Sequence, residues 1–281
     1  MTESARPWVL ITGCSTGIGR ALVGTCRAAG WGVVATARAR TALDGLPPGP
    51  DLDCLSLDVT SPDSIAAAVA ACRGRRLTAL VNNAGYGQMG PLEWIDTGTL
   101  RAQFETNVLG LHAVTRAFLP LIRAGAGPDE GRIVQVASVL GRMSVPMAGA
   151  YCASKHAVVA LAEALRLELE PGIRVILVEP GAIQSEFRET LVKALGDLPA
   201  RIKGTRFEPI LSTYLARHEA RQNHGLDAQA CARRITAAMA KTHPPRRVVI
   251  GADARWANAA KAVLPAALWE WAVRRSFGLK P

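Results

Sequence analysis

A tyrosine and a lysine four positions apart, Tyr151 and Lys155, have the types and the spacing for acid–base chemistry. The Ala- and Leu-rich run that follows, residues 157–169, predicts a helix, on which the two side chains share one face. A tyrosine with an ordinary pKa of about 10 is a poor base at neutral pH, and a neighbouring ammonium favours the phenolate. We therefore expect Lys155 to lower the pKa of Tyr151, although an ordinary surface pair has the same spacing.

A glycine-rich turn near the N-terminus predicts a dinucleotide site. The apolar run of residues 8–12 indicates a buried parallel strand, a helical pattern covers residues 20–29, and a second strand follows at 32–37. Strand, glycine-rich turn, helix and strand together form a nucleotide-binding unit, in which a pyrophosphate approaches the backbone at the helix N-terminus. The expected contacts are Gly13, Ser15, Thr16, Gly17, Ile18 and Gly19.

The end of the second predicted strand favours NADP over NAD. A site for NAD places an acidic residue about 20 positions after the glycines, where it binds the ribose hydroxyl. Residues 36–40 contain no acid, and Arg38 has a guanidinium that can pair with a ribose phosphate. The alternative is that Arg38 only stacks on the adenine, which would also permit NAD.

Later strand ends add residues at the same predicted site. Strands are expected at 53–57, 79–81, 132–137, 174–179 and 247–250, with helices between them. Ligands of open parallel sheets bind at the carboxyl ends of the strands. We therefore expect further cofactor contacts from Asp58, Val59, Asn83, Ala84, Gly85, Pro180, Gly181, Ile183 and Ser185, and Ser138 at the same edge.

Several of these positions have simpler explanations that stay open. Asp58 lies in the N-terminal cap region of the helix expected at 61–71, and both roles can hold. A turn alone would explain Asn83 to Gly85, and Ser138 is an ordinary residue for a strand end. Asn107 lies inside a helical run, where asparagine is disfavoured unless its side chain has a role.

The predicted fold is α/β: one Rossmann-like domain over residues 1–281, doubly wound, with a mainly parallel seven-stranded sheet and helices on both faces. Residues 186–226 show no clean period and are expected to form a substrate loop or lid. The C-terminal extension, residues 252–281, combines aromatic with basic residues. Packing on a partner subunit or over the substrate pocket is favoured for it, and peripheral membrane contact is the alternative.

Composition limits the expected binding partners and the expected cellular compartment. The net charge of +10 comes from residues 188–281, which carry 17 basic and 7 acidic side chains. A solvated basic surface is the favoured explanation over an anionic substrate or membrane, and no pattern supports nucleic acid. Six scattered cysteines without metal-type spacing indicate reduced thiols, with no metal site. With no apolar run long enough to span a membrane and no signal peptide in the polar residues 1–7, we expect a cytoplasmic protein.

The motifs occur together in a recognisable order. The chain resembles the classical short-chain dehydrogenase/reductases over about residues 8–250. The turn Thr12 to Gly19 and the strand end Ala35 to Arg38 look most like the steroid- and retinoid-type branch of that family. The motifs that carry the resemblance are Thr12-Gly13-x3-Gly17-x-Gly19, Asn82-Asn83-Ala84-Gly85, Asn107, Ser138, Tyr151-x3-Lys155 and Pro180-Gly181.

The resemblance implies a tetrad of Asn107, Ser138, Tyr151 and Lys155. Tyr151 would be the general acid in carbonyl reduction or the base in alcohol oxidation, and Ser138 would hydrogen-bond the substrate oxygen. Lys155 would also bind the nicotinamide ribose, and Asn107 would hold a water that links Lys155 to bulk solvent. The nicotinamide carboxamide would meet the backbone of Ile183.

Two departures from the family pattern concern the cofactor. Ser185 stands where the family often has threonine, and either hydroxyl can make the same bond. Thr16 stands where NADP-binding members carry a basic residue, which leaves Arg38, with Ser15 or Arg40, to bind the phosphate.

The leading hypothesis is hydride transfer between NADP(H) and a small lipophilic secondary alcohol, ketone or aldehyde, by a homodimer or homotetramer. A non-catalytic module that senses the dinucleotide and a membrane-surface-associated reductase are the alternatives. Apolar residues near the site in sequence are candidates for the pocket, with ordinary core as the equal alternative: Trp94, Met143, Val145, Met147, Phe187 and Leu191.

Overall fold

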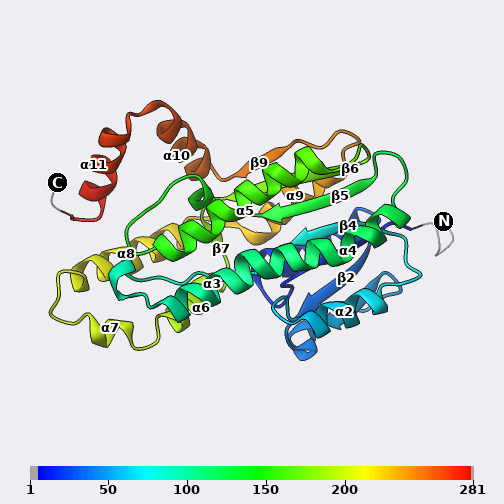
Figure 1. Cartoon of the computed structure of the whole chain (residues 1–281), viewed down its shortest axis with the longest axis horizontal. Helices are drawn as coiled ribbons and strands as arrows, with labels where there is room; N and C mark the ends of the chain where they lie inside the picture. Colours follow the sequence, from blue (N-terminus) through cyan, green and yellow to red (C-terminus); the bar gives the residue numbers. More distant parts are fainter. Residues whose placement is uncertain (1–5, 280–281) are drawn as a thin grey trace.

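The computed structural model describes residues 6–279, and it is built on a seven-stranded parallel sheet (Figure 1). The strand order is β3-β2-β1-β4-β5-β6-β9, so the chain starts in the middle of the sheet and winds outward in both directions. The strands are β1 (Trp8–Ile11), β2 (Gly32–Ala37), β3 (Leu52–Ser56), β4 (Leu77–Asn82), β5 (Gly131–Val136), β6 (Ile173–Pro180) and β9 (Arg247–Ile250). This arrangement confirms the predicted fold class.

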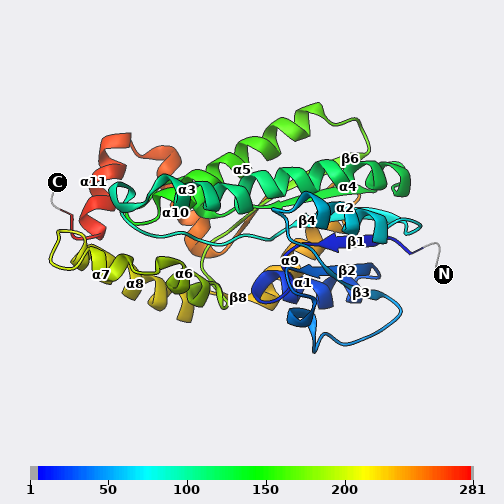
Figure 2. The same ribbon diagram turned by 60° about the horizontal axis from the view of Figure 1, so that its bottom comes forward.

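Helices cover both faces of the sheet because the strands alternate apolar side chains between two cores. One core packs Leu10, Val34, Leu80 and Ile133 against α2 (Pro62–Ala71), α4 (Leu111–Gly125) and α5 (Gly149–Glu168). The other packs the intervening strand residues against α1 (Gly17–Ala28) and α9 (Ala228–Met239). Figure 2 shows these layers, with α4 and α5 on one side of the strands and α1 and α9 on the other.

The segment 186–226 differs from its interpretation as an aperiodic loop. It folds into α6 (Phe187–Leu195), α7 (Leu198–Arg201) and α8 (Glu208–Asn223). Its two ends are joined by a short parallel pair between β7 (Ile183–Gln184) and β8 (Leu226–Asp227). These helices pack a third apolar cluster beyond the strand ends, with Leu191, Leu198 and Ile210 among its buried members.

The C-terminal extension forms two helices, α10 (Ala252–Val263) and α11 (Ala266–Ser276), which lie on the same side of the sheet edge as α6–α8 (Figures 1 and 2). Trp256 and Trp271 are 77% and 49% exposed, whereas Phe277 is only 8% exposed and joins the third apolar cluster. The extension therefore packs over the region beyond the strand ends through Phe277. Among the described helices, none is long and apolar enough to cross a membrane.

A buried carboxylate holds the last strand on the sheet. Glu179 in β6 is fully buried and pairs with Arg247 of β9 at 2.5 Å and with Arg142 at 2.8 Å. Both arginines keep part of their side chains in solvent, so only the carboxylate is fully desolvated. These contacts fix the edge of the sheet on which α10 begins.

The glycine-rich turn supplies a direct test of the fold. A Cβ added at Gly19 would lie 2.1 Å from the Gly13 carbonyl oxygen, whereas one added at Gly24 in the same helix would meet nothing within 4 Å. We expect Gly19→Ala to lower the free energy of unfolding by about 1–3 kcal/mol, because the clash is with backbone. Gly24→Ala is the control and should raise it by about 0.5–1 kcal/mol. Denaturant unfolding checks both, and equal effects would contradict the described turn.

Candidate active site

A cavity of 670 Å³ lies at the carboxyl ends of the strands and extends under α6 and α8. Residues from nearly every predicted motif line it, although they lie far apart in the sequence. The predicted residues on its wall are Gly13, Ser15, Thr16, Gly17, Ile18, Arg38, Asp58, Val59, Asn83, Ala84, Gly85, Ser138, Tyr151, Lys155, Pro180, Gly181, Ile183 and Ser185. Gly19 and Asn107 are absent from the wall and lie behind it.

Asn83 braces the glycine-rich turn. Its side-chain amide donates to the carbonyl oxygens of Thr12 and Gly13, at 3.0 Å each. The hydroxyl of Thr12 in return accepts from the backbone N–H groups of Asn83 and Ala84, at 2.9 and 3.0 Å. Gly13 has a φ of +73°, a conformation that favours glycine. The first and fourth strands are thus tied together where the turn begins.

The turn ends at an open helix N-terminus. Thr16 is the N-cap of α1, and within the described chain its side chain makes no capping hydrogen bond. The first N–H groups of the helix are therefore available to a ligand, and a helix N-terminus favours an anion. Gly17, with a φ of +56°, faces Ser185 across this point, and an added Cβ would lie 3.1 Å from the Ser185 Cβ.

Arg38 and Asp58 stand at the other end of the cofactor half of the cavity. Arg38 follows β2 and is exposed, and no ion pair holds its guanidinium within residues 6–279. Asp58 follows β3 and accepts two hydrogen bonds from Thr60, which, with the more distant charge of Arg38, lower the pKa of this carboxyl. The N-cap of α2 is Ser61, so Asp58 acts as a turn residue beside the cap.

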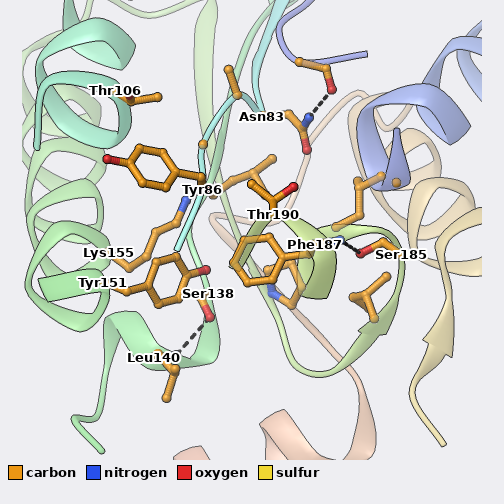
Figure 3. A pocket seen from close by; sticks show the side chains of 18 of the residues that line it. Asn83, Tyr86, Thr106, Ser138, Leu140, Tyr151, Lys155, Ser185, Phe187 and Thr190 are labelled. Carbon is orange, nitrogen blue, oxygen red and sulfur yellow. Dashed lines mark hydrogen bonds between the residues drawn. The ribbon is translucent and has the colours of Figure 1, made fainter. Parts of the chain in front are cut away.

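Tyr151, Ser138 and Lys155 converge on the middle of the cavity (Figure 3). Tyr151 and Lys155 come from the first turns of α5, and Ser138 follows β5 as the N-cap of a short helical turn, where it accepts from the Leu140 N–H at 3.1 Å. The Lys155 ammonium lies 5.8 Å from the centre of the Tyr151 ring and donates to the Val136 carbonyl at 2.9 Å. The predicted helical face is therefore confirmed.

Burial reverses the predicted direction of the tyrosine pKa. Desolvation raises the pKa of Tyr151 to about 12, against the smaller lowering effect of its hydrogen bond with Ser138. Desolvation also lowers the pKa of Lys155 to about 8. A low pKa of Tyr151 is therefore not a property of the chain by itself, and its lowering by Lys155 together with a cationic cofactor ring stays a prediction for the complex. Tyr151 is held protonated at neutral pH, which suits a proton donor.

Asn107 is fully buried in a π-helical turn, Glu105–Gly110, between α3 (Thr97–Phe104) and α4. Its side chain accepts from the Tyr86 N–H at 3.0 Å, and donates to the Tyr86 carbonyl at 2.9 Å and to Ser154 at 3.1 Å. π-helical turns are rare and frequently occur at functional sites. The side chain that the sequence predicts to have a role therefore fixes the loop after β4 against α5.

The substrate half of the cavity was predicted only in part. Val145 and Phe187 line it, but Trp94, Met147 and Leu191 belong to the third apolar cluster and Met143 is buried elsewhere. Nearness in sequence did not separate the pocket wall from the core. The wall residues that sequence reasoning missed include Tyr86, Met89, Thr190, Ala194, Tyr214, Arg217, His218 and Phe277. Most of them lie in residues 186–226, where no clean period marks a helical face.

The donor set fits a nicotinamide dinucleotide. The open N-terminus of α1 suits a pyrophosphate, and the glycines let it approach the backbone. Arg38 and Asp58 suit the adenosine end, and the strand ends at Ala84 and Gly181 open toward Tyr151. When bound, this group supplies a hydride acceptor or donor.

The family model for short chain dehydrogenases matches residues 7–196, more than half of the sequence. Curated relatives agree over larger spans. An uncharacterized oxidoreductase, YbbO, of Escherichia coli strain K12 is 38% identical over 70% of this chain and 73% of its own. The type 1 17-beta-hydroxysteroid dehydrogenase of Mus musculus is 36% identical over 85% and 72%. Retinol dehydrogenase 16 of Rattus norvegicus is 33% identical over 94% and 88%.

Solved structures show the same relationship. A short-chain dehydrogenase from Streptomyces avermitilis superposes with a TM-score of 0.76 at 33% identity, over 97% of both chains. One from Burkholderia cenocepacia in complex with NADP gives 0.72 at 25% over 100% of both, and one from Burkholderia phymatum in complex with NAD gives 0.77 at 26% over 97% of both. The chain belongs to the short-chain dehydrogenase family, a family of oxidoreductases that bind nicotinamide dinucleotides.

The pKa of Lys155 predicts a pH-dependent stability. Between pH about 8 and about 10.5, the unfolded chain binds a proton at Lys155 that the folded chain does not. The stability of the wild type relative to Lys155→Met should therefore rise through this window, by up to about 3 kcal/mol. Denaturant unfolding of both proteins at several pH values measures the difference. Lys241→Met, at an exposed lysine, is the control, and a fall in relative stability through the window would contradict the buried ammonium.

Proposed function

We propose that this protein is an NADP-preferring oxidoreductase that transfers a hydride between NADP(H) and a lipophilic secondary alcohol, ketone or aldehyde. The observation that carries the proposal is the convergence of Tyr151, Ser138 and Lys155 in the cavity that also contains the open N-terminus of α1. A hydride donor and a proton donor can thus meet one carbonyl group.

The roles follow from what each side chain can do. Tyr151, held protonated by burial, donates a proton to the carbonyl oxygen in reduction and accepts it in oxidation. Ser138, beside Tyr151 on the cavity wall, holds that oxygen in place. Lys155, Ile183 and Ser185 hold the nicotinamide end. A cationic ring and the Lys155 charge close to Tyr151 would both oppose its raised pKa, which favours the oxidative direction in the complete complex.

Asn107 has a positioning role in this proposal. Its side chain is occupied by Tyr86 and Ser154, so it orients the floor of the site beside Lys155. We retain the hypothesis that a water at this turn links Lys155 to solvent. The supporting observation is that Asn107 and Lys155 lie on either side of one point beside Gly85. A Cβ added at Gly85 would lie 3.0 Å from the Asn107 side-chain oxygen and 3.6 Å from the Lys155 nitrogen.

The preference for NADP rests on Arg38. It lines the cavity after β2, in the place where an NAD site has an acid, and residues 36–40 contain none. The neighbouring Asp58 is occupied by Thr60, two residues further on. A phosphate on the ribose would find a guanidinium there that no carboxylate of the described chain holds in an ion pair.

The lipophilic substrate is supported by the substrate half of the cavity. Its wall is largely aromatic and apolar, including Met89, Leu140, Phe187, Tyr214 and Phe277. The relatives named for 17-beta-hydroxysteroids and for retinol agree with such a substrate. We extend the proposal to a cytoplasmic location, which the six free cysteines support. We also propose a homo-oligomer.

Two other functions make different predictions. A dinucleotide-sensing module would bind the cofactor without needing Tyr151. A membrane-surface-associated reductase is favoured by the exposed Trp256 and Trp271 beside Arg255 and Arg275 on α10 and α11.

Liposome co-sedimentation tests the membrane-associated reductase. Loss of liposome binding on deletion of α10 and α11 would support it, and binding that persists after the deletion would reject it.

Loss of reduced-cofactor absorbance, measured over a panel of hydrophobic ketones and aldehydes, tests the proposal. We expect turnover with NADPH to exceed turnover with NADH, and Tyr151→Phe to reduce it by about a hundredfold or more, because the proton donor is removed. The control is NADPH binding by Tyr151→Phe, which should be retained and shows that the variant is folded. Turnover that survives Tyr151→Phe, or cofactor binding without any turnover, would contradict the assigned chemistry.

A further inference from the structure

We propose that Arg217 binds an anionic group of the substrate. Arg217 lies at one end of the aromatic wall of the cavity, and Tyr151 lies at the other end. This inference deepens the proposed function and rests on it: the substrate would be amphipathic, with its carbonyl at Tyr151, a hydrophobic body, and a carboxylate, sulfate or phosphate at the other end.

A row of rings connects the two ends. Tyr151 contacts Phe187 at 5.8 Å between ring centres, and Phe187 stacks on His218 at 6.3 Å. His218 contacts Tyr214 at 6.1 Å, and Tyr214 stacks on Phe277 at 6.2 Å. All five rings line the cavity, and they come from α5, α6, α8 and the residue after α11. Figure 3 shows the first two, Tyr151 and Phe187, side by side. Such a wall suits an extended apolar body.

Arg217 stands at the last of these rings. Its guanidinium carbon lies 5.1 Å from the centre of the Phe277 ring, and the half-buried side chain lines the cavity. A guanidinium that lies over an aromatic face keeps its in-plane N–H groups available, and these match a carboxylate or phosphate in a bidentate arrangement. The aromatic contact therefore orients the charge without consuming its donors.

No acidic side chain of the described chain neutralises this charge. Other arginines with little exposure have polar partners: Arg27 pairs with Asp51 and Arg142 with Glu179, whereas Arg132 donates to backbone carbonyls. Within residues 6–279, Arg217 has no ion pair. The two carboxylates on the cavity wall are engaged elsewhere: Asp58 accepts from Thr60, and Asp253 accepts from the Ala182 N–H. Among the described residues this guanidinium has no charged partner, so an incoming anion would be its first, in a site with reduced access to water.

Paired ketones that differ only in charge test the inference. The probes are acetyl-substituted benzene, biphenyl and terphenyl carboxylates, each with its neutral carboxamide, so that the distance from ketone to anion varies. The proteins are the wild type, Arg217→Gln, Arg217→Lys and Arg206→Gln. Arg206 is the matched control, because it also lies over a phenylalanine ring, Phe207, but is absent from the cavity wall.

We expect the wild type to prefer the carboxylate over the carboxamide for at least one length, measured as kcat/KM with NADPH. Arg217→Gln should lower that preference by about ten- to a hundredfold, because a charge-assisted hydrogen bond is lost. Arg217→Lys should keep part of the preference for the carboxylate. Arg206→Gln should keep all of it. The preference should also weaken as ionic strength rises.

Binding separates this inference from the proposed function. Calorimetry of the same ketones, with and without NADP⁺, reports recognition of the anion without any turnover. An Arg217-dependent preference in binding, without turnover, would support the anion site and reject the proposed reaction. Equal use and equal binding of carboxylates and carboxamides at every length, or equal losses of both in Arg217→Gln, would overturn the inference.

Discussion

Parallel pairing of the sheet is the constraint on which the site depends. Because all seven strands run the same way, the residues that follow β1, β2, β3, β4, β5 and β6 meet at one edge. Asn83 ties the first and fourth strands at that edge through Thr12 and Gly13. Residues from six separate loops thereby surround one cavity, together with the N-terminus of α1 and the first turns of α5.

Burial decides the chemistry within that cavity. Placing α5 against the sheet removes Tyr151 and Lys155 from water, which disfavours the charged form of each. The chain by itself therefore keeps a protonated phenol beside an easily neutralised amine. In the proposed function, a bound dinucleotide would add charges close to both groups and so change these pKa values in the complex.

The sequence predicted the fold and the central part of the site because the relevant signals are local. Short apolar runs, each followed by glycine, asparagine or serine, mark a strand and its carboxyl end without any knowledge of packing. The helices of residues 186–226 were missed because Gly196 and Gly204 lie between them, and because Pro199 and Pro209, in the first turns of α7 and α8, are residues typical of turns. Cavity-facing polar residues such as Thr190 and Arg217 also interrupt their apolar stripes.

Other failures came from contacts that spacing cannot show. Phe277 reaches the cavity by packing on Tyr214, far away in the sequence, and no periodicity reports such a contact. The direction of the Tyr151 pKa depends on how much water reaches the phenol, whereas spacing reports only that Lys155 is near. Trp94 and Leu191 are apolar and near the site in sequence, yet they fill the core beside it.

The most direct test of hydride transfer with Tyr151 as proton donor follows the transferred hydrogen. NADPH carrying deuterium at both positions of nicotinamide C4 is oxidised with a hydrophobic ketone that the protein accepts, and the product alcohol is analysed by mass spectrometry and NMR. The account predicts one deuterium on the carbinol carbon with the wild type, and at least a hundredfold slower transfer with Tyr151→Phe. Cofactor oxidation without deuterium in the alcohol, or transfer by Tyr151→Phe at the wild-type rate, would contradict it.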